Sequence, residues 1–282
     1  MANTNIPDVQ LNDGNKIPQL GFGVFKVPDD ETQRAVEHAI EAGYRSIDTA
    51  AFYQNERGVG AGITNSGVPR DELFITSKVW NDAHGRDNTR RSFEESLEKL
   101  KLDRLDMFLI HWPVPSRDLY VETWQALVEL QAEGLVTSIG VSNFEPAHLE
   151  RLRAESGVVP VVNQVELHPY LVQAAVREYD AAHGIVTEAW SPLAKGGDLL
   201  EQAVLTEIGA RYGKSPAQVV IRWHIQLGNV VIPKSVTPSR MSQNIDVFDF
   251  ALTAAEVDAV SALDSDKRTG PNPNVFVAPP AA

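Results

Sequence analysis

The stretch LFITSK at residues 73–78 is followed by a segment of helical periodicity and then by LDMFLIH at residues 105–111. Both apolar runs have the length of a strand, and Phe93, Leu97 and Leu100 between them recur at the spacing of one helix face. A strand, a helix and a second strand in this order predict a βαβ unit, whose two strands lie parallel in one sheet.

The same alternation continues on both sides of this unit. Further strand candidates occupy residues 20–24, 45–48, 137–141, 161–165, 186–190 and 230–233, with helical patterns between them, such as 29–42. Eight strands that alternate with helices favour a closed (β/α)8 TIM barrel over an open sheet. An open sheet that binds a dinucleotide usually carries Gly-x-Gly-x-x-Gly after its first strand, and GFGVFK at residues 21–26 does not complete that pattern.

Features outside the repeat complete the predicted α/β fold. The turn sequence NDGN at residues 12–15 lies between two short extended segments and predicts an N-terminal β-hairpin. Helical stretches at 201–212 and 216–227 both follow the seventh strand, and the capping box from Thr253 to Glu256 predicts a further helix. We therefore expect one domain, residues 1–282, in which a hairpin and two extra helices are added to the barrel.

Composition narrows the function classes. The chain has no cysteine, which excludes disulfides, thiolate metal sites and a cysteine nucleophile. Its 25 Lys and Arg against 38 Asp and Glu give a net charge of −13, which repels nucleic acid and anionic lipid. No signal peptide and no apolar run long enough to span a bilayer is visible. We expect a cytoplasmic monomer with no nucleic-acid or membrane partner.

Titratable residues follow three consecutive predicted strands. Asp48 ends the second strand, with Tyr53 in the loop behind it, while Lys78 ends the third and His111 the fourth. Each alone is more often a loop cap, a solvated charge or a packing residue, but the carboxyl ends of barrel strands form one rim, where active sites lie. We expect Tyr53 to donate a proton, Lys78 to lower the pKa of that phenol, Asp48 to hold Lys78, and His111 to bind a substrate oxygen. This set suits protonation of a carbonyl oxygen and, with no metal-ligand set in view, predicts no metal.

A second polar group follows the eighth strand. Lys234, Ser235 and Arg240 surround Thr237-Pro238, which pairs an N-cap residue with a proline at the first helical position. The N–H groups and the dipole of such a helix bind phosphate, and loops after the last barrel strands often do so. The alternative is an ordinary capped helix with two solvated cations.

Aromatic residues accompany the predicted strand ends. Trp80, Trp112 and Trp190 fall at or just beyond three of them, and Phe22 is near the end of the first strand. A tryptophan is most often a core residue, but several at one rim predict an apolar cleft with a flat wall on which a cofactor ring can stack.

Three longer motifs carry a family resemblance. They are GYRSIDTA at 43–50 with YQNE at 53–56, IGVSNF at 139–144, and IPKS at 232–235 with Arg240, Gln243 and Asn244. With them the chain resembles the aldo-keto reductase family, and in particular the bacterial 2,5-diketo-D-gluconate reductases and methylglyoxal reductases. The likeness extends from the hairpin to the last helix.

The resemblance implies NADPH as the cofactor and a small carbonyl compound as the substrate. It implies a catalytic tetrad of Asp48, Tyr53, Lys78 and His111, with Tyr53 as the general acid. The cofactor contacts that it implies are Gly23, Val24, Asp48, Ser142, Asn143, Gln164, Trp190, Ser191, Leu193, Lys234, Ser235, Val236, Thr237, Arg240, Gln243 and Asn244. The substrate contacts are Phe22, Trp80, His111 and Trp112.

The expected reaction is NADPH-dependent reduction of small aldehydes and ketones, such as keto-sugar acids and α-oxoaldehydes. Two alternatives remain at this point. One is a Schiff-base aldolase on the same barrel with Lys78 as the nucleophile. The other is a nicotinamide-binding sensor or scaffold that has lost turnover.

Overall fold

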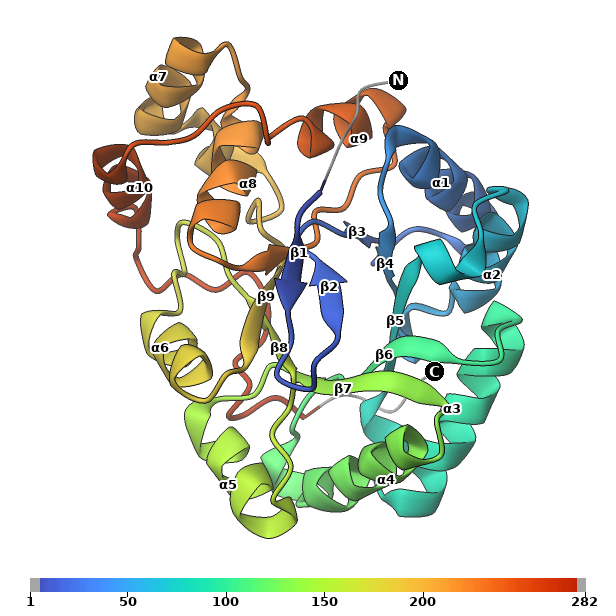
Figure 1. The fold of residues 1–282 in the computed structure, drawn as a ribbon. Coiled ribbons are helices and arrows are strands. Elements are labelled where there is room, and N and C mark those ends of the chain that lie inside the picture. Colours follow the sequence, from blue (N-terminus) through green and yellow to red (C-terminus); the bar gives the residue numbers. More distant parts are fainter. Residues whose placement is uncertain (1–5, 278–282) are drawn as a thin grey trace.

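The computed structural model describes residues 6–277. Its centre is an eight-stranded parallel sheet whose strands are neighbours in the order of the sequence (Figure 1). The strands are β3 (Phe22–Gly23), β4 (Ser46–Asp48), β5 (Phe74–Val79), β6 (Leu105–Ile110), β7 (Val136–Ser142), β8 (Val162–Glu166), β9 (Val186–Trp190) and β10 (Val230–Val231). A parallel bridge between Leu20 and Val231 joins the two edges and closes the barrel. The predicted (β/α)8 fold is confirmed.

Helices surround this barrel. They are α1 (Asp29–Ala42), α2 (Glu56–Asn65), α3 (Arg86–Leu100), α4 (Tyr120–Ala132), α5 (Pro146–Ser156), α6 (Ala174–Ala182), α7 (Ala203–Tyr212), α8 (Pro216–Gln226), α9 (Pro238–Ile245) and α10 (Ala254–Ser261), with short 3-10 turns η1 (Ala51–Tyr53), η2 (Arg70–Glu72), η3 (Asn81–Ala83), η4 (Pro115–Arg117) and η5 (Gly197–Glu201). The extra helices are as predicted: α7 and α8 both lie between β9 and β10, and α10 follows α9. Within residues 6–277, no helix has the length and hydrophobicity required to cross a bilayer.

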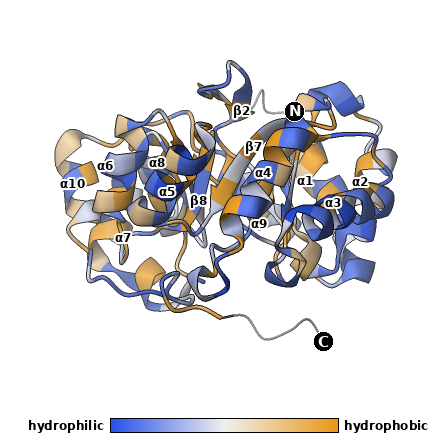
Figure 2. Cartoon of the chain, turned by 90° about the horizontal axis from the view of Figure 1, so that it is seen from below, coloured by the Kyte–Doolittle hydropathy of each residue, from blue (hydrophilic) through white to orange (hydrophobic). Residues whose placement is uncertain are grey.

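Apolar periodicity explains how the helices pack on the sheet. In α1 the residues Ala35, Val36, Ala39 and Ile40 recur at helical spacing, and all four are buried against the barrel. Figure 2 shows the same division across the molecule, with hydrophilic residues concentrated on the outer surfaces of helices such as α3. The main hydrophobic core therefore lies between the helices and the outer face of the sheet.

A hairpin covers one end of the barrel. The strands β1 (Asp8–Gln10) and β2 (Lys16–Pro18) pair antiparallel around Gly14, whose φ of +90° favours glycine. Asp13 Oδ2 accepts a hydrogen bond from Ser138 Oγ of β7 at 2.7 Å and so fixes the turn to the barrel. The hairpin and the segment that leads to the C-terminus lie at opposite ends of the molecule (Figure 2). The hairpin therefore leaves the opposite end of the barrel, where the C-terminal segment lies, available for a site.

The expected N-cap residues Thr237 and Thr253 are both confirmed, but only Thr253 forms a cap bond with its side chain. Ser215 and Thr253 both form capping boxes, with Gln218 and Glu256 respectively. Thr237 is the N-cap residue of α9, but its side chain forms no cap bond with any residue of the described chain. Instead, the Ser235 Oγ atom accepts a hydrogen bond from Thr237 N at 3.1 Å, and the Thr237 side chain is exposed. The N–H groups at the start of α9 are therefore not capped by that threonine.

Candidate active site

Lys78 and Asp48 form a buried ion pair at the centre of the candidate site. Lys78 Nζ donates hydrogen bonds to Asp48 Oδ1 at 2.7 Å, to Asp48 Oδ2 at 2.8 Å and to the Thr49 carbonyl oxygen at 2.9 Å. The lysine is 0% exposed. Burial works against the ammonium charge, but the Asp48 carboxylate and then Tyr53 outweigh it, so the pKa of Lys78 is raised. The ammonium is thus held charged in one fixed position.

Tyr53 lies beside this pair at the end of η1. The centre of its ring is 5.1 Å from Lys78 Nζ and 5.6 Å from the centre of the His111 ring. Burial raises the pKa of Tyr53 to about 12, although the Lys78 ammonium acts to lower it. Lys78 does act to lower the pKa of Tyr53, as expected, but the expected net decrease is wrong. The loss of solvent around the phenol outweighs the nearby charge. Near neutral pH the phenol carries its proton, as a proton donor must.

His111 follows β6 and completes the group at the barrel mouth. It is 7% exposed, and its Nδ1 atom has no hydrogen-bond partner among the described residues. Burial, then the charge of Lys78 and then His84 lower the pKa of His111 well below its usual value. The imidazole is therefore neutral near pH 7 and carries a single ring N–H, which can donate one hydrogen bond. The structure brings Asp48, Tyr53, Lys78 and His111 together from three consecutive strands, β4, β5 and β6, and the loops that follow them.

Aromatic side chains line this mouth as expected. Trp80 and Trp112 form a small cluster with Val114, against which Trp190 and Phe276 pack. The ring centres of Trp80 and His111 are 4.9 Å apart, and those of Trp112 and Phe276 are 4.5 Å apart. Phe276 belongs to the C-terminal segment, so that segment contributes to the wall.

The side chains of Phe22 and Val24 lie in the core rather than at the barrel mouth, where the Phe22 side chain was expected. Gly23 pairs with Asp48, and Phe22 pairs with Ile47. Because successive side chains of a strand point to opposite faces, Phe22 and Val24 share the outer face with Ile47, while Gly23 faces the interior. Phe22 and Val24 are 1% and 0% exposed and belong to the main core.

Two other phenylalanines occupy the place expected for Phe22. Phe25 is 42% exposed, with its ring centre 4.9 Å from that of Tyr53, and Phe52 is 41% exposed and stacks on Trp80 at 3.8 Å. Both lie in loops just beyond strand ends, where the periodicity of a strand no longer indicates direction. Their position in loops after strands could have identified them from the sequence as site residues, since an apolar side chain in such a loop often lines a site.

The expected nicotinamide contacts form one hydrogen-bonded group. Asn143 Nδ2 donates to the His111 carbonyl oxygen at 2.9 Å, and Trp190 Nε1 donates to Asn143 Oδ1 at 2.8 Å. Ser142 Oγ donates to the Gln164 carbonyl oxygen at 2.8 Å, and Ser142 pairs with Gln164 across β7 and β8. These residues therefore stand next to the ion pair and orient the Trp190 ring.

The expected phosphate contacts lie together at the junction of β10 and α9. Lys234, Val236, Thr237, Arg240 and Gln243 are exposed there, whereas Ser235 and Asn244 are nearly buried. Ser191 and Leu193, which follow β9, are partly exposed, and Ser191 has a φ of +48°. Lys234, Arg240 and the positive end of the α9 dipole are therefore local positive charges on an acidic protein.

One buried acid of the site escaped the sequence analysis. Glu188 of β9 is 2% exposed, and its Oε2 atom accepts a hydrogen bond from Gln164 Nε2 at 2.8 Å. The same Gln164 nitrogen donates to Asp48 Oδ2 at 2.9 Å. Glu188 lies in the middle of an apolar-looking strand rather than at its end, so a search of strand ends does not find it.

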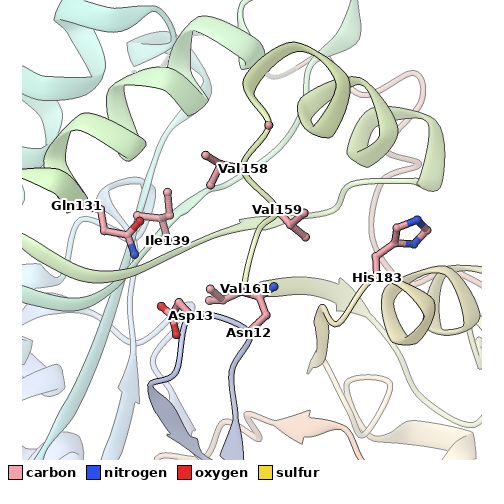
Figure 3. A pocket seen from close by; sticks show the side chains of 9 residues that line it. Asn12, Asp13, Gln131, Ile139, Val158, Val159, Val161 and His183 are labelled. Atoms are coloured by element: carbon pink, nitrogen blue, oxygen red, sulfur yellow. The ribbon is translucent and has the colours of Figure 1, made fainter.

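A separate hollow of about 420 Å³ lies at the hairpin end (Figure 3). Asn12 and Asp13 of the hairpin, Gln131 and His183 are among its lining residues. Active sites of this fold lie at the carboxyl ends of the strands, and this hollow is at the other end. It holds none of the expected site residues.

Comparison with known proteins agrees with this geometry. The model of the Aldo/keto reductase family matches residues 19–265. The chain belongs to the aldo/keto reductase family. As a member of it, the protein is an oxidoreductase that acts on small carbonyl compounds.

Individual relatives cover almost the whole reductase. It is 53% identical over 270 residues to an aldo-keto reductase of Mycolicibacterium smegmatis, covering 96% of this chain and 98% of the relative. It is 52% identical over 277 residues to methylglyoxal reductase DkgA of Escherichia coli, covering 98% and 99%. Among solved structures, a mutant of Gox0644 in complex with NADPH matches with a TM-score of 0.93 at 49% identity, covering 96% of this chain and 99% of that chain.

Proposed function

We propose that this aldo-keto reductase reduces small α-oxoaldehydes, such as methylglyoxal, with NADPH. The observation that carries the proposal is the buried Lys78–Asp48 ion pair beside the protonated phenol of Tyr53. The relation to methylglyoxal reductase DkgA supports the substrate class, and the NADPH complex of Gox0644 supports the cofactor.

The residues present fit a nicotinamide dinucleotide. Gln164 donates both hydrogens of its amide to carboxylates, and no described residue donates to its Oε1 atom, which can therefore accept from a carboxamide N–H. The start of α9 offers N–H groups that the Thr237 side chain does not cap, with Lys234 and Arg240 nearby, and these suit a phosphate. Trp190, held by Asn143, offers a ring face for stacking.

The tetrad would then perform the proton chemistry. When bound, reduced nicotinamide supplies a hydride for the carbonyl carbon. The N–H of neutral His111 donates a hydrogen bond to the carbonyl oxygen and orients it. As negative charge develops on that oxygen, Tyr53 transfers its proton to it, and the Lys78 ammonium stabilises the phenolate that remains. Asp48 keeps that ammonium in place throughout.

The burial of Lys78 argues against the aldolase alternative. A lysine that forms a Schiff base must lose its proton and reach the substrate. Lys78 is 0% exposed, gives hydrogen bonds to three acceptors and has a raised pKa. The sensor alternative disagrees with the family relation, which identifies the chain as an oxidoreductase.

The test is the oxidation of NADPH followed by its absorbance, with methylglyoxal, other aldehydes and 2,5-diketo-D-gluconate as substrates. Tyr53→Phe removes the transferable proton and leaves the ring, so we expect kcat to fall about 10²- to 10⁴-fold while the Kd for NADPH is unchanged. If the wild-type chain binds NADPH but none of these carbonyl compounds causes its oxidation, the result would favour a sensor. Full activity of the phenylalanine variant would remove Tyr53 from the role of acid.

A further inference from the structure

Two side chains, the amide of Gln164 and the carboxyl group of Glu188, extend the ion pair toward β9. Lys78 binds Asp48, Asp48 accepts from Gln164 at 2.9 Å, and Gln164 donates to Glu188 at 2.8 Å. All four residues are between 0% and 2% exposed. They come from β4, β5, β8 and β9, so the network crosses the barrel interior. Glu188 is the last residue of this network, at the end opposite Lys78, and has no part in the mechanism above.

Asp48 and Glu188 together fix which way the Gln164 amide points. Asp48 is paired with an ammonium and can only accept a hydrogen bond, so the nitrogen of Gln164 must face it. Glu188 accepts the second hydrogen of that same nitrogen. With both hydrogens used, the amide cannot rotate without losing two bonds, and its oxygen is left for another donor.

We propose that Glu188 is a positioning residue of the active site, which holds the Gln164 oxygen toward the nicotinamide carboxamide and adds a second carboxyl group to the charges around Lys78. This inference rests on the proposed function, because it takes Gln164 as a contact of the nicotinamide. Glu188 itself need not touch the cofactor or the substrate.

The charge state of Glu188 affects the acid of the reaction. Burial and then the Asp48 carboxylate raise the pKa of Glu188 to about 7, while Gln164 and Lys78 act in the opposite direction. A charged Glu188 in turn acts to raise the pKa of Tyr53. As the pH increases through about 7, Glu188 loses its proton, the cluster gains a negative charge, and Tyr53 becomes a weaker proton donor. The rate of carbonyl reduction should therefore decrease across this range.

Two substitutions separate positioning from charge. Glu188→Gln can still accept the Gln164 hydrogen bond but cannot titrate, so we expect an unchanged Kd for NADPH and no rate decrease near pH 7. Glu188→Ala removes the acceptor as well, so we expect the Kd for NADPH to increase about 3- to 10-fold, the effect of one net hydrogen bond. Fluorescence quenching gives the Kd, and kcat/KM for methylglyoxal from pH 5.5 to about 9 gives the profile.

Asp180 provides a matched control. It lies in α6, outside the barrel, and binds side chains on the outer face of the same two strands. It accepts hydrogen bonds from Thr187 Oγ1 at 2.9 Å and, more weakly, from Asn163 Nδ2, which are the neighbours of Glu188 and Gln164. Burial raises the pKa of Asp180 to about 7 as well. Asp180→Asn should therefore leave both the Kd and the pH profile as in the wild type.

The outcomes distinguish this inference from the proposed function. If the wild-type enzyme does not oxidise NADPH with any carbonyl compound, the proposed function fails. If the wild-type enzyme is active but both Glu188 variants keep its Kd for NADPH and its rate decrease near pH 7, the positioning role is overturned and the proposed function stands. The glutamine variant alone decides the effect of charge if the alanine variant does not fold.

Discussion

Arg240 is the residue on which the choice between NADPH and NADH is expected to depend. It lies in the first turn of α9 and is exposed, as is Lys234 in the loop before that helix. The two cofactors differ only in a phosphate on the adenosine ribose, so a guanidinium that binds this phosphate has nothing equivalent to bind in NADH. The loss of the Arg240 side chain should therefore weaken the binding of NADPH but not that of NADH.

Arg240→Ala should weaken the binding of NADPH by about 1.5–3 kcal/mol, or roughly 10- to 150-fold, because hydrogen bonds to a charged group contribute that much. The Kd for NADH should change little. Arg91→Ala, in the exposed surface of α3, is a suitable control for the loss of one positive charge. Equal losses for both cofactors in the Arg240 variant would mean that this residue does not bind the phosphate.

At the scale of elements, the segment after α10 is fixed to β8 and packs on the active site. The buried Glu166 carboxylate accepts hydrogen bonds from Thr269 Oγ1 at 2.6 Å and from the Gly270 N–H at 3.0 Å. A Cβ atom at Gly270 would come within 2.5 Å of the Trp190 ring, so the backbone of this segment lies directly against that ring. The position of the segment and the orientation of Trp190 are therefore linked.

Gly270→Ala should move either the segment or the Trp190 ring, because overpacking of this kind costs about 1 kcal/mol or more. We expect a several-fold increase in the Kd for NADPH and in the KM for the carbonyl substrate, with a smaller effect on kcat. Pro271→Ala, at the next and exposed position, introduces no new contact and serves as the control. Titration of Trp fluorescence with NADPH measures the effect, and an unaltered titration would argue against contact of Trp190 with the cofactor.

At the scale of the whole molecule, one end of the barrel contributes to stability and the other holds the candidate active site. The hairpin end is held by Asp13, which accepts from Ser138 Oγ at 2.7 Å and from Asn15 N at 3.0 Å, while the candidate site lies at the other end. A substitution at the hairpin should therefore change stability without changing catalysis.

Asp13→Ala should lower the free energy of unfolding by about 1–3 kcal/mol, because it leaves a buried hydroxyl short of a partner. The melting temperature should fall by roughly 2–4 °C for each kcal/mol in a chain of this size. Asp8→Ala, at an exposed position of the same hairpin, should have little effect. Calorimetry and the standard assay test this together, and a loss of kcat in the Asp13 variant would contradict the separation of the two ends.

The order of elements in this protein could be predicted from its sequence alone. Apolar periodicity is a local property, so it marked eight strands and the helices between them, including α1 with its full bounds. The polar strand ends at Asp48, Lys78 and His111 then followed from the rule that the carboxyl ends of barrel strands share one rim.

Only the tertiary structure decided how individual side chains face and how strongly they ionise. Phe25 rather than Phe22 lies over Tyr53, because the first strand ends sooner than its apolar run. Glu188 joins Asp48 through Gln164, a residue 116 positions from Asp48 in the chain, and no local pattern encodes such a contact. The net pKa of Tyr53 depends on how much solvent the closed barrel removes, which is a property of the packed molecule rather than of any stretch of sequence.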